Sequence, residues 1–323
     1  MNATARITIH SSQFPEQVRR DLLASLRNRR VNHKFHYDSL KQTQKWLAVH
    51  EAHSPARRDE NCLTAYDRAF LAAAKKIKAS QLHILSLGCG GGQKDRRLLG
   101  HLNARGRTLF YTPCDVSPAM VLVARQAALA VLPAKNCSPF VCDLATADDL
   151  KRFLVTRNPA LVTFFGMIPN FEPQQILPQL AALIRPKDWL LFSANLAPGH
   201  HYAAGVKQVL PQYDNALTRD WLGTFLADLG VGRGDGRMRF RIADDASNGL
   251  KRIAADFRFA RPRRINIEND AFEFRAGEII QLFFSYRYTP GRVRRTLSRH
   301  GLEVSAEWIA DSGEEGVFLC RRN

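Results

Sequence analysis

The sequence lacks the features that would place it in a membrane or among secreted, disulfide-rich proteins. No run of about 18 apolar residues occurs in the 323-residue chain, which argues against a transmembrane helix. The polar start MNATARITIHSSQ has no basic segment followed by an apolar one, as a signal peptide would. The six cysteines form no C-x-x-C pair. We therefore expect a cytoplasmic protein with no disulfide framework and no zinc or other metal site.

Acidic residues are also scarce. There are 30 aspartates and glutamates against 47 lysines and arginines, so the formal net charge is +17. Such an excess favours an anionic partner, which could be nucleic acid or a phosphorylated or carboxylate ligand. However, the basic residues come as scattered pairs rather than one run, which is typical of a solvated surface. The charge alone therefore names no partner, and the sequence does not indicate an oligomeric state.

The middle of the chain alternates short apolar runs with helical stretches. Parallel strands that are covered on both faces read as continuous apolar runs, and alternation with helices is the βαβ pattern. The predicted strands are LHILSLGC, TLFYTPCDVS, SPFVCDL, ALVTFFGMI and DWLLFSANL, and the predicted helices between them are DRRLLGHL, PAMVLVARQAALAVL and QILPQLAALI. This pattern predicts a doubly wound α/β fold.

Three segments are expected around this pattern. Residues 1–60 predict a helical N-terminal segment, in which HKFHYDSLKQTQKWLAVHEAHSPARR is expected to be a loop-rich lid. Residues 197–284 break the alternation and predict an inserted α+β substrate-binding domain. Residues 61–196 and 285–323 would form the main domain, which ends with a helix and two strands.

A glycine-rich turn, LGCGGG at residues 87–92, directly follows the first apolar strand. Glycines let the backbone approach a ligand, and the next helix directs its amides toward it, but such a turn alone is a weak signal. Asp115 ends the second strand, where a carboxylate can accept both ribose hydroxyls, and Asp143 with Leu144 ends the third, beside an adenine. An aspartate–leucine pair after the third strand is typical of methyltransferases rather than dinucleotide enzymes. We therefore predict S-adenosylmethionine binding by Gly88, Cys89, Gly90, Asp115, Asp143 and Leu144.

With these residues in place, the chain resembles the histidine Nα-methyltransferases that make hercynine for ergothioneine synthesis. The resemblance spans roughly residues 31 to 320 and runs through landmarks in that family's order: LGCGGGQKDRRLL, FYTPCDVS, FFGMIPNF, PKDWLLFSANL, QYDN and AGEIIQLFFSYRYT. It implies a class I methyltransferase (Rossmann-like) domain, an inserted domain that closes over the substrate, and methyl transfer to an amino-acid amine.

The resemblance also implies residue roles. Gly88 and Gly90 would line the methionine part of the cofactor, Lys94 would pair with its carboxylate, Asp115 would hold the ribose and Asp143 the adenine. An ammonium in the first turn after the glycines can meet an α-carboxylate.

On the acceptor side, the family's amine- and carboxylate-binding positions fall on Tyr37, Asn170 and Tyr213, which we predict to be catalytic. Groups that orient the amine toward the sulfonium methyl supply much of the rate in such a displacement.

The departures from the family suggest a different acceptor. Where the family has a glutamate and a serine that read the imidazole ring, this chain has Phe283 and Ser285. Two large side chains of the family are replaced by Ala254 and Ala255, and a tyrosine pair is replaced by His53-Ser54, before Pro55-Ala56-Arg57. Specificity that depends on hydrogen bonds is lost steeply when a partner is removed. We therefore predict a larger or more apolar amine than histidine, such as an aromatic amino acid, bound by Tyr37, His53, Asn170, Tyr213, Phe283 and Ser285.

Two alternatives stay open at this point. A nucleic-acid (RNA) methyltransferase is suggested by the net charge and by Arg258, Arg261, Arg263 and Arg264 in the insertion, although no nucleic-acid-binding module is legible. A non-catalytic relative that only binds S-adenosylmethionine is suggested by the pocket departures. The sequence favours a small-molecule N-methyltransferase.

Overall fold

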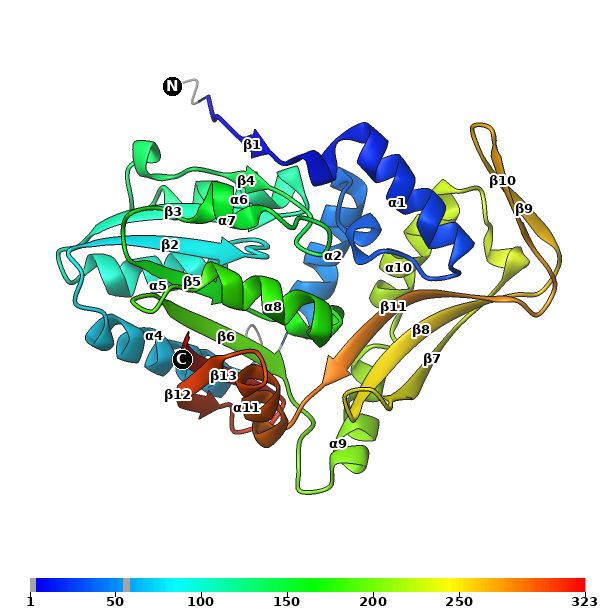
Figure 1. Cartoon of the computed structure of the whole chain (residues 1–323). Helices are drawn as coiled ribbons and strands as arrows, with labels where there is room; N and C mark the ends of the chain where they lie inside the picture. Colours follow the sequence, from blue (N-terminus) through cyan, green and yellow to red (C-terminus); the bar gives the residue numbers. More distant parts are fainter. Residues whose placement is uncertain (1–3, 55–58, 323) are drawn as a thin grey trace. The chain divides into compact units, whose positions relative to one another are not determined.

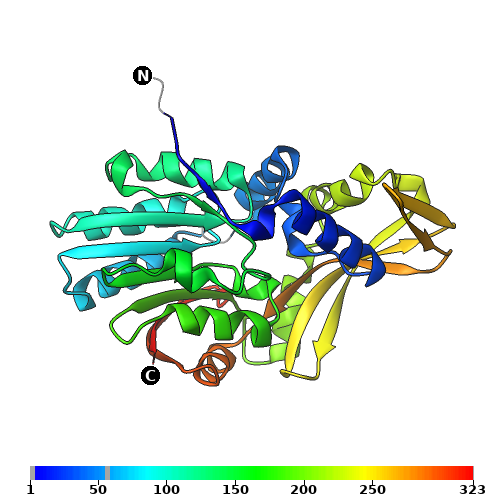
Figure 2. The ribbon, with the colours of Figure 1, turned by 45° about the horizontal axis from the view of Figure 1, so that its top comes forward.

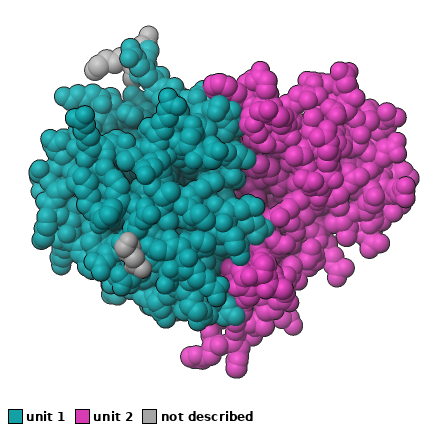
Figure 3. All heavy atoms as spheres, in the orientation of Figure 1, with its two compact units in different colours: residues 1–13, 55–196, 288–323 teal, residues 14–54, 197–287 magenta. Residues whose placement is uncertain are grey.

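The computed structural model describes residues 4–54 and 59–322, so that residues 55–58, with the Pro55-Ala56-Arg57 motif, lie outside it. The chain divides into two compact units, shown in two colours in Figure 3. Unit 1 comprises Met1–Gln13, Pro55–Leu196 and Tyr288–Asn323, and unit 2 comprises Phe14–Ser54 and Ala197–Arg287.

Unit 1 is built on an eight-stranded sheet with the order β1-β4-β3-β2-β5-β6-β13-β12. β1 to β6 are parallel, whereas β13 is antiparallel to both β6 and β12. The strands are β1 (Thr8–Ile9), β2 (Gln81–Leu87), β3 (Thr108–Asp115), β4 (Phe140–Val141), β5 (Ala160–Phe164), β6 (Trp189–Asn195), β12 (Leu302–Ile309) and β13 (Glu315–Arg322). The α/β doubly wound sheet predicted from the sequence is confirmed.

Helices cover both faces of this sheet (Figures 1 and 2). α5 packs between α4 and α6, and α7 packs against α8. Their bounds are α4 (Glu60–Lys76), α5 (Gln93–Asn103), α6 (Pro118–Ala128), α7 (Leu150–Leu154), α8 (Pro173–Leu183) and α11 (Pro290–Ser298). Three short 3₁₀ helices complete the unit: η1 (Ser11–Gln13), η3 (Ala134–Asn136) and η4 (Ile168–Asn170). Alternation of side chains along β2 places Leu82 and Ile84 in one core with Tyr66 and Phe70 of α4.

The N-terminal residues are divided differently from the single segment 1–60 that the sequence suggested. β1 pairs with β4 in the sheet of unit 1, whereas α1 (Pro15–Arg27) buries Leu23 and Leu26 in the core of unit 2. The expectation of a loop-rich stretch is wrong for Leu40–His53, which form helix α2. Ser39 caps this helix by accepting a hydrogen bond from the amide of Gln42, and neither glycine nor proline interrupts it.

Unit 2 is an α+β body with an antiparallel three-stranded sheet, β11-β8-β7, and a separate hairpin of β9 and β10. Its strands are β7 (Gly236–Asp245), β8 (Leu250–Phe259), β9 (Arg263–Ile267), β10 (Asp270–Phe274) and β11 (Ile279–Arg287). Its further helices are η2 (His33–His36), α9 (Tyr202–Val209), η5 (Leu210–Gln212), α10 (Ala216–Asp228) and η6 (Arg233–Asp235). The boundary expected between residues 284 and 285 falls inside β11, because this strand pairs with β8 up to Arg287.

No helix in the part of the chain that the structure describes is both long and apolar enough to cross a membrane. Within the same residues, no group of three or more histidine, cysteine or acidic side chains is arranged to hold a metal ion.

Candidate functional site

The glycine turn, residues 88–92, connects β2 to α5 with backbone angles that side chains disfavour. Gly88, Gly90 and Gly92 have φ values of +73°, +49° and +71°. A Cβ on Gly92 would lie 2.6 Å from the Cα of Ala124, so α5 can pack closely on α6 only with a glycine here. The turn therefore brings a closely packed backbone to the start of α5, where helix amides favour an anionic group.

A second turn, residues 166–170, packs on the glycine turn. β5 lies beside β2 in the parallel sheet, so the segments that follow these strands leave the sheet at the same edge. A Cβ on Gly88 would lie 2.2 Å from the Sδ of Met167, which shows how closely the two turns approach. Asn170 is half-buried, ends η4 and donates its backbone N–H to the carbonyl of Met167 over 3.0 Å. The structure thus brings the Asn170 turn to the glycine turn, at the point where the strand order reverses.

Asp115, the last residue of β3, supports the glycine turn. Its carboxylate accepts hydrogen bonds from the amides of Gly90 (3.0 Å) and Ser117 (3.1 Å). Burial raises the pKa of Asp115, and these amide hydrogen bonds oppose the rise. The side chain predicted to hold a ribose therefore also fixes the backbone predicted to hold the methionine part.

Asp143 and Leu144 follow β4 and are both buried. The Asp143 carboxylate accepts a hydrogen bond from the amide of Ala145 (2.9 Å), and its own amide donates to Ser12 Oγ (2.9 Å). Ser12 lies next to β1, outside the span of the resemblance to the family. No signal in the sequence had connected it with Asp143.

Lys94 lies in the first turn of α5, as expected, but it has partners that sequence reasoning missed. Its ammonium donates to Tyr66 Oη over 2.6 Å and to Glu315 Oε1 over 3.1 Å. The sequence had suggested no role for either Tyr66 or Glu315.

Tyr213 and Ser285, two of the predicted acceptor residues, are in direct contact within unit 2. The Tyr213 hydroxyl lies 2.9 Å from Ser285 Oγ and accepts a hydrogen bond from the Arg287 guanidinium over 2.8 Å. Ser285 and Arg287 are buried and, two residues apart on β11, share one face of the strand. Arg287 was missed, although this spacing from Ser285 was a signal for it.

Aromatic rings connect two other predicted acceptor residues, Phe283 and Tyr37, to Tyr213. The Phe283 ring lies 5.8 Å from Trp221 and 6.3 Å from Tyr213, and the Tyr37 ring lies 5.4 Å from Trp221. Trp46 extends the cluster at 6.0 Å from Tyr37. Trp221, which the sequence had not singled out, therefore joins Tyr37 to Phe283, and Phe283 continues the cluster to Tyr213 and Ser285.

His53 does not join this cluster. It is half-buried at the end of α2 and, among the residues the structure describes, makes no hydrogen bond or ring contact with the cluster. Ala255 and Ala254 are fully buried and pair in register with Phe283 and Phe284 of β11. The small side chain of Ala255 is thus the cross-strand neighbour of the Phe283 ring.

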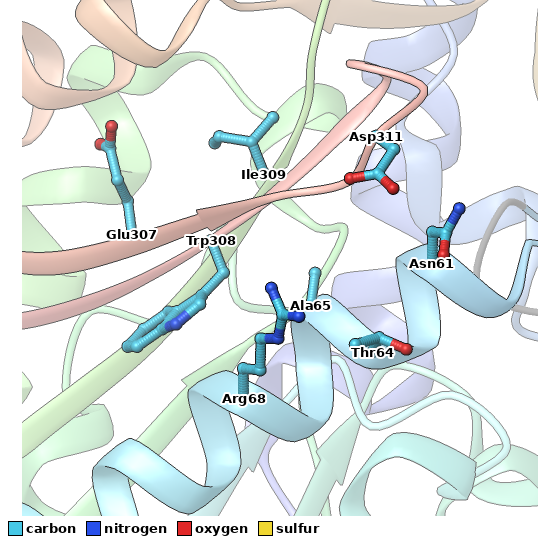
Figure 4. A pocket seen from close by; sticks show the side chains of 8 residues that line it. All are labelled: Asn61, Thr64, Ala65, Arg68, Glu307, Trp308, Ile309 and Asp311. Atoms are coloured by element: carbon cyan, nitrogen blue, oxygen red, sulfur yellow. The ribbon is translucent and has the colours of Figure 1, made fainter.

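A separate hollow in unit 1 contains none of the predicted residues (Figure 4). It lies between α4 and the end of β12 and is lined by Asn61, Thr64, Ala65, Arg68, Glu307, Trp308, Ile309 and Asp311.

The predicted residues are shared between the two units. Unit 1 contains Asn170 and the predicted cofactor residues Gly88, Cys89, Gly90, Lys94, Asp115, Asp143 and Leu144, whereas unit 2 contains Tyr37, His53, Tyr213, Phe283 and Ser285.

Comparison with known proteins gives a match over nearly the whole chain. A family model described as "Histidine-specific methyltransferase, SAM-dependent" matches residues 16–322. The chain is 24% identical over 271 residues to the N-methyltransferase imqF of Aspergillus flavus, covering 81% of this chain and 72% of that protein.

Among solved structures, it is similar to the magnesium protoporphyrin IX methyltransferase of Synechocystis, with 12% identity and a TM-score of 0.47 over 90% of this chain and 98% of that chain. It is also similar to the CcbJ methyltransferase of Streptomyces caelestis, with 14% identity and a TM-score of 0.39 over 80% of this chain and 94% of that chain.

Proposed function

Because this chain belongs to the family of S-adenosylmethionine-dependent histidine-specific methyltransferases, we propose that it methylates the α-amine of an amino acid with an aromatic or apolar side chain. The chain is a methyltransferase with S-adenosylmethionine as its cofactor, and it acts on a small molecule by N-methylation, the activity for which imqF is named. The choice of acceptor and the residue roles below are our proposal, as is a cytoplasmic location.

The residues of unit 1 fit the cofactor. Gly88 and Gly90 open the backbone to its methionine part, Asp115 is assigned to the ribose, and Asp143, with Leu144, is assigned to the adenine. Lys94 and Cys89, at the same edge of the sheet, are assigned to the methionine end. When bound, S-adenosylmethionine supplies a methyl group on a positively charged sulfur, which an amine can displace in one in-line step.

The remaining task of the protein is to hold the amine in line. An amine needs hydrogen-bond acceptors that aim its lone pair, and we assign this role to Asn170, Tyr37 and Tyr213. Arg287 and Ser285 fix the Tyr213 hydroxyl on two sides, so its oxygen has a defined position. The neutral fraction of the bound amine is sufficient for attack, so no strong base is required.

One observation carries the choice of acceptor: Phe283 stands where the family resemblance places a glutamate, and it packs among aromatic rings. The cluster of Tyr37, Trp221, Tyr213, Phe283 and Ser285 offers rings and hydroxyls but no carboxylate to pair with an imidazole. Such a surface favours an aromatic or apolar side chain by burial and ring contacts. It disfavours histidine, whose ring nitrogens would lose a charged partner.

The RNA alternative finds less support in unit 2 than the sequence suggested. Arg261 forms an ion pair with Asp235 at 2.7 Å, and Arg263 lies 3.6 Å from the same carboxylate. Two of the four arginines behind that alternative are therefore already engaged within the protein.

An acceptor screen tests the proposal. The protein is incubated with S-adenosylmethionine and each proteinogenic amino acid in turn, and methylated products are detected by mass. We expect an aromatic amino acid to be the best acceptor; histidine as the best acceptor would overturn the proposal.

A variant tests the role of Asn170. Asn170→Ala should lower turnover on the order of 100-fold while S-adenosylhomocysteine still binds, because the variant loses orientation of the amine rather than the cofactor site. Asn266→Ala, on the exposed β9–β10 hairpin, is the matched control and should keep full turnover. Full turnover in Asn170→Ala would remove Asn170 from the mechanism.

A further inference from the structure

A buried polar network crosses the apolar core of unit 1 between α4, β6 and β13. Tyr66, Ser193 and Glu315 are 1%, 0% and 5% exposed, respectively, and they meet among apolar side chains. Buried polar groups cost stability unless every one of them finds a partner, and a satisfied network also fixes positions strictly. The groups that these three residues hold in place therefore indicate what the network does.

One end of the network holds Lys94. The lysine ammonium lies 2.6 Å from Tyr66 Oη, 3.1 Å from Glu315 Oε1 and 4.1 Å from the centre of the Tyr66 ring. Burial alone would raise the pKa of Glu315, but the charge of Lys94 and the hydrogen bonds from Tyr66 and Lys94 hold it below its ordinary value. The pair is therefore ionic, and the ammonium, with three donors, keeps one for a further acceptor.

The other end of the network reaches the 166–170 turn. The Tyr66 hydroxyl donates to Glu315 and lies 2.8 Å from Ser193 Oγ. Ser193 Oγ in turn accepts a hydrogen bond from the amide of Gly166 over 2.8 Å. Gly166 is the first residue of the turn that places Met167 against Gly88 and ends at Asn170.

The Tyr66 hydroxyl thus links the lysine beside the glycine turn, through Ser193, to the turn that carries Asn170. We propose that Tyr66 and Ser193 are positioning residues for methyl transfer, with Glu315 as the counter-charge: together they hold the Lys94 ammonium for the carboxylate of S-adenosylmethionine and fix the 166–170 turn beside it. This inference rests on the roles proposed above for Lys94 and Asn170.

A purely structural network would behave differently from a positioning network. Removing a hydroxyl from a buried network that only stabilises the core lowers the melting temperature, but the folded protein binds its cofactor as before. Removing it from a positioning network also changes cofactor affinity and the mobility of the turn. Binding and hydrogen exchange therefore separate the two cases.

The test uses Tyr66→Phe and Ser193→Ala in the full chain. S-adenosylhomocysteine is titrated by calorimetry, and amide hydrogen exchange of residues 165–171 is followed by mass spectrometry. Tyr66→Phe should weaken binding about tenfold, the effect of one hydrogen bond to a charged group, and speed exchange in the turn. Ser193→Ala should speed exchange in the turn while changing the affinity by less than about twofold, because the Lys94–Tyr66 contact remains.

Thr112→Val is the matched control, since it removes a buried hydrogen bond to His83 (2.9 Å) in the same sheet, away from Lys94 and the turn. It should leave both readouts unchanged. The inference would be overturned if both test variants showed wild-type affinity and wild-type exchange. If Tyr66→Phe does not fold, the exchange rate of residues 165–171 in Ser193→Ala alone shows whether the network holds the turn. The acceptor screen tests the proposed function separately. If the wild-type enzyme methylates an amino acid and both variants bind S-adenosylhomocysteine normally with normal exchange in the turn, the proposed network is refuted. If the variants change binding and exchange but no amino acid is methylated, the proposed acceptor is refuted.

Discussion

The two units assemble their candidate residues in different ways. In unit 1 most of the proposed cofactor residues lie at or just after the ends of strands, and backbone amides hold them in place, as when Gly90 and Ser117 donate to Asp115. In unit 2, Tyr37 follows η2, Tyr213 follows η5, and Phe283 and Ser285 lie on β11; these residues meet through side-chain contacts, with Trp221 of α10 between Tyr37 and Phe283. Backbone geometry therefore shapes the proposed cofactor half, whereas side-chain contacts shape the proposed acceptor half, which can diverge without altering the eight-stranded sheet of unit 1.

The largest expected effect is on cofactor affinity, and it comes from removing the Asp115 carboxylate of unit 1. Asp115→Ala loses two amide hydrogen bonds that support the glycine turn, together with the proposed ribose acceptor. At about 1.5 kcal/mol for each bond to a charged group, affinity for S-adenosylhomocysteine should fall on the order of 100-fold. Calorimetric titration of the variant measures this.

Two variants make that result a test of the comparison. Asp188→Ala removes another buried carboxylate of unit 1, which binds Ala160 and Arg185, and it should lower stability while leaving the affinity nearly unchanged. Tyr213→Phe, in unit 2, should likewise leave the affinity nearly unchanged. A loss with Tyr213→Phe as large as that with Asp115→Ala would break the division into a cofactor half and an acceptor half.

The second effect concerns acid, because burial lowers the pKa of His83 in unit 1 and of His33 and His36 in unit 2. Burial lowers the pKa of His36 in unit 2 to about 4, and burial with the charge of Arg185 lowers the pKa of His83 in unit 1 to about 4. Both are neutral in the folded protein, whereas in the unfolded chain they take up a proton near pH 6.5. The free energy of unfolding is therefore unaffected by these histidines above about pH 6.5, and it falls as the pH drops from there toward 4.

At pH 5, protonation of each histidine in the unfolded chain should lower the free energy of unfolding by about 2 kcal/mol. Urea unfolding at pH 7 and pH 5, followed by hydrogen exchange in each unit, measures the loss. His36→Gln should reduce the acid sensitivity of unit 2 and His83→Gln that of unit 1. Equal sensitivity in wild type and both variants would show that other groups control acid unfolding.

The sequence was sufficient for the central sheet and insufficient for the contacts that cross it. Strands β2 to β6, the helices α5, α6 and α8 and the closing α11, β12 and β13 follow from apolar periodicity, because that pattern is local, whereas the five-residue helix α7 was missed. β1 was missed because two residues carry no periodicity. Tyr66, Glu315 and Trp221 were missed because their roles depend on partners on other helices and strands, from 28 residues away for Tyr66 and Lys94 to 249 for Tyr66 and Glu315, on which a local pattern contains no information.

The acceptor half followed from the sequence only where a family pattern was available. Phe283 and Ser285 were found because the resemblance names their positions, and the structure shows the geometry that the pattern lacks: Phe283 packs on Trp221, and Ser285 contacts Tyr213. His53 came from the same pattern, yet it lies apart from the cluster in the described residues.

The smallest expected effect, and the one that sharpens the comparison most, is a change of acceptor preference at Phe283. Phe283→Glu introduces the carboxylate that the family resemblance places there, beside the hydroxyls of Ser285 and Tyr213 and opposite the small side chain of Ala255. A carboxylate can pair with an imidazole, whereas it opposes burial of an apolar ring. The ratio of kcat/KM for histidine to that for phenylalanine should therefore rise about tenfold, the effect of one such hydrogen-bonded partner.

Phe283→Leu separates charge from space at this position, because it removes the ring without adding a carboxylate. It should lower activity with phenylalanine and leave histidine no better than before, since leucine restores no partner for the imidazole. Affinity for S-adenosylhomocysteine should stay the same in both variants, because Phe283 belongs to unit 2 and the cofactor residues to unit 1. If leucine shifts the preference as much as glutamate, the acceptor half selects by volume rather than by charge; if neither shifts it, selection lies elsewhere than in the Trp221 cluster.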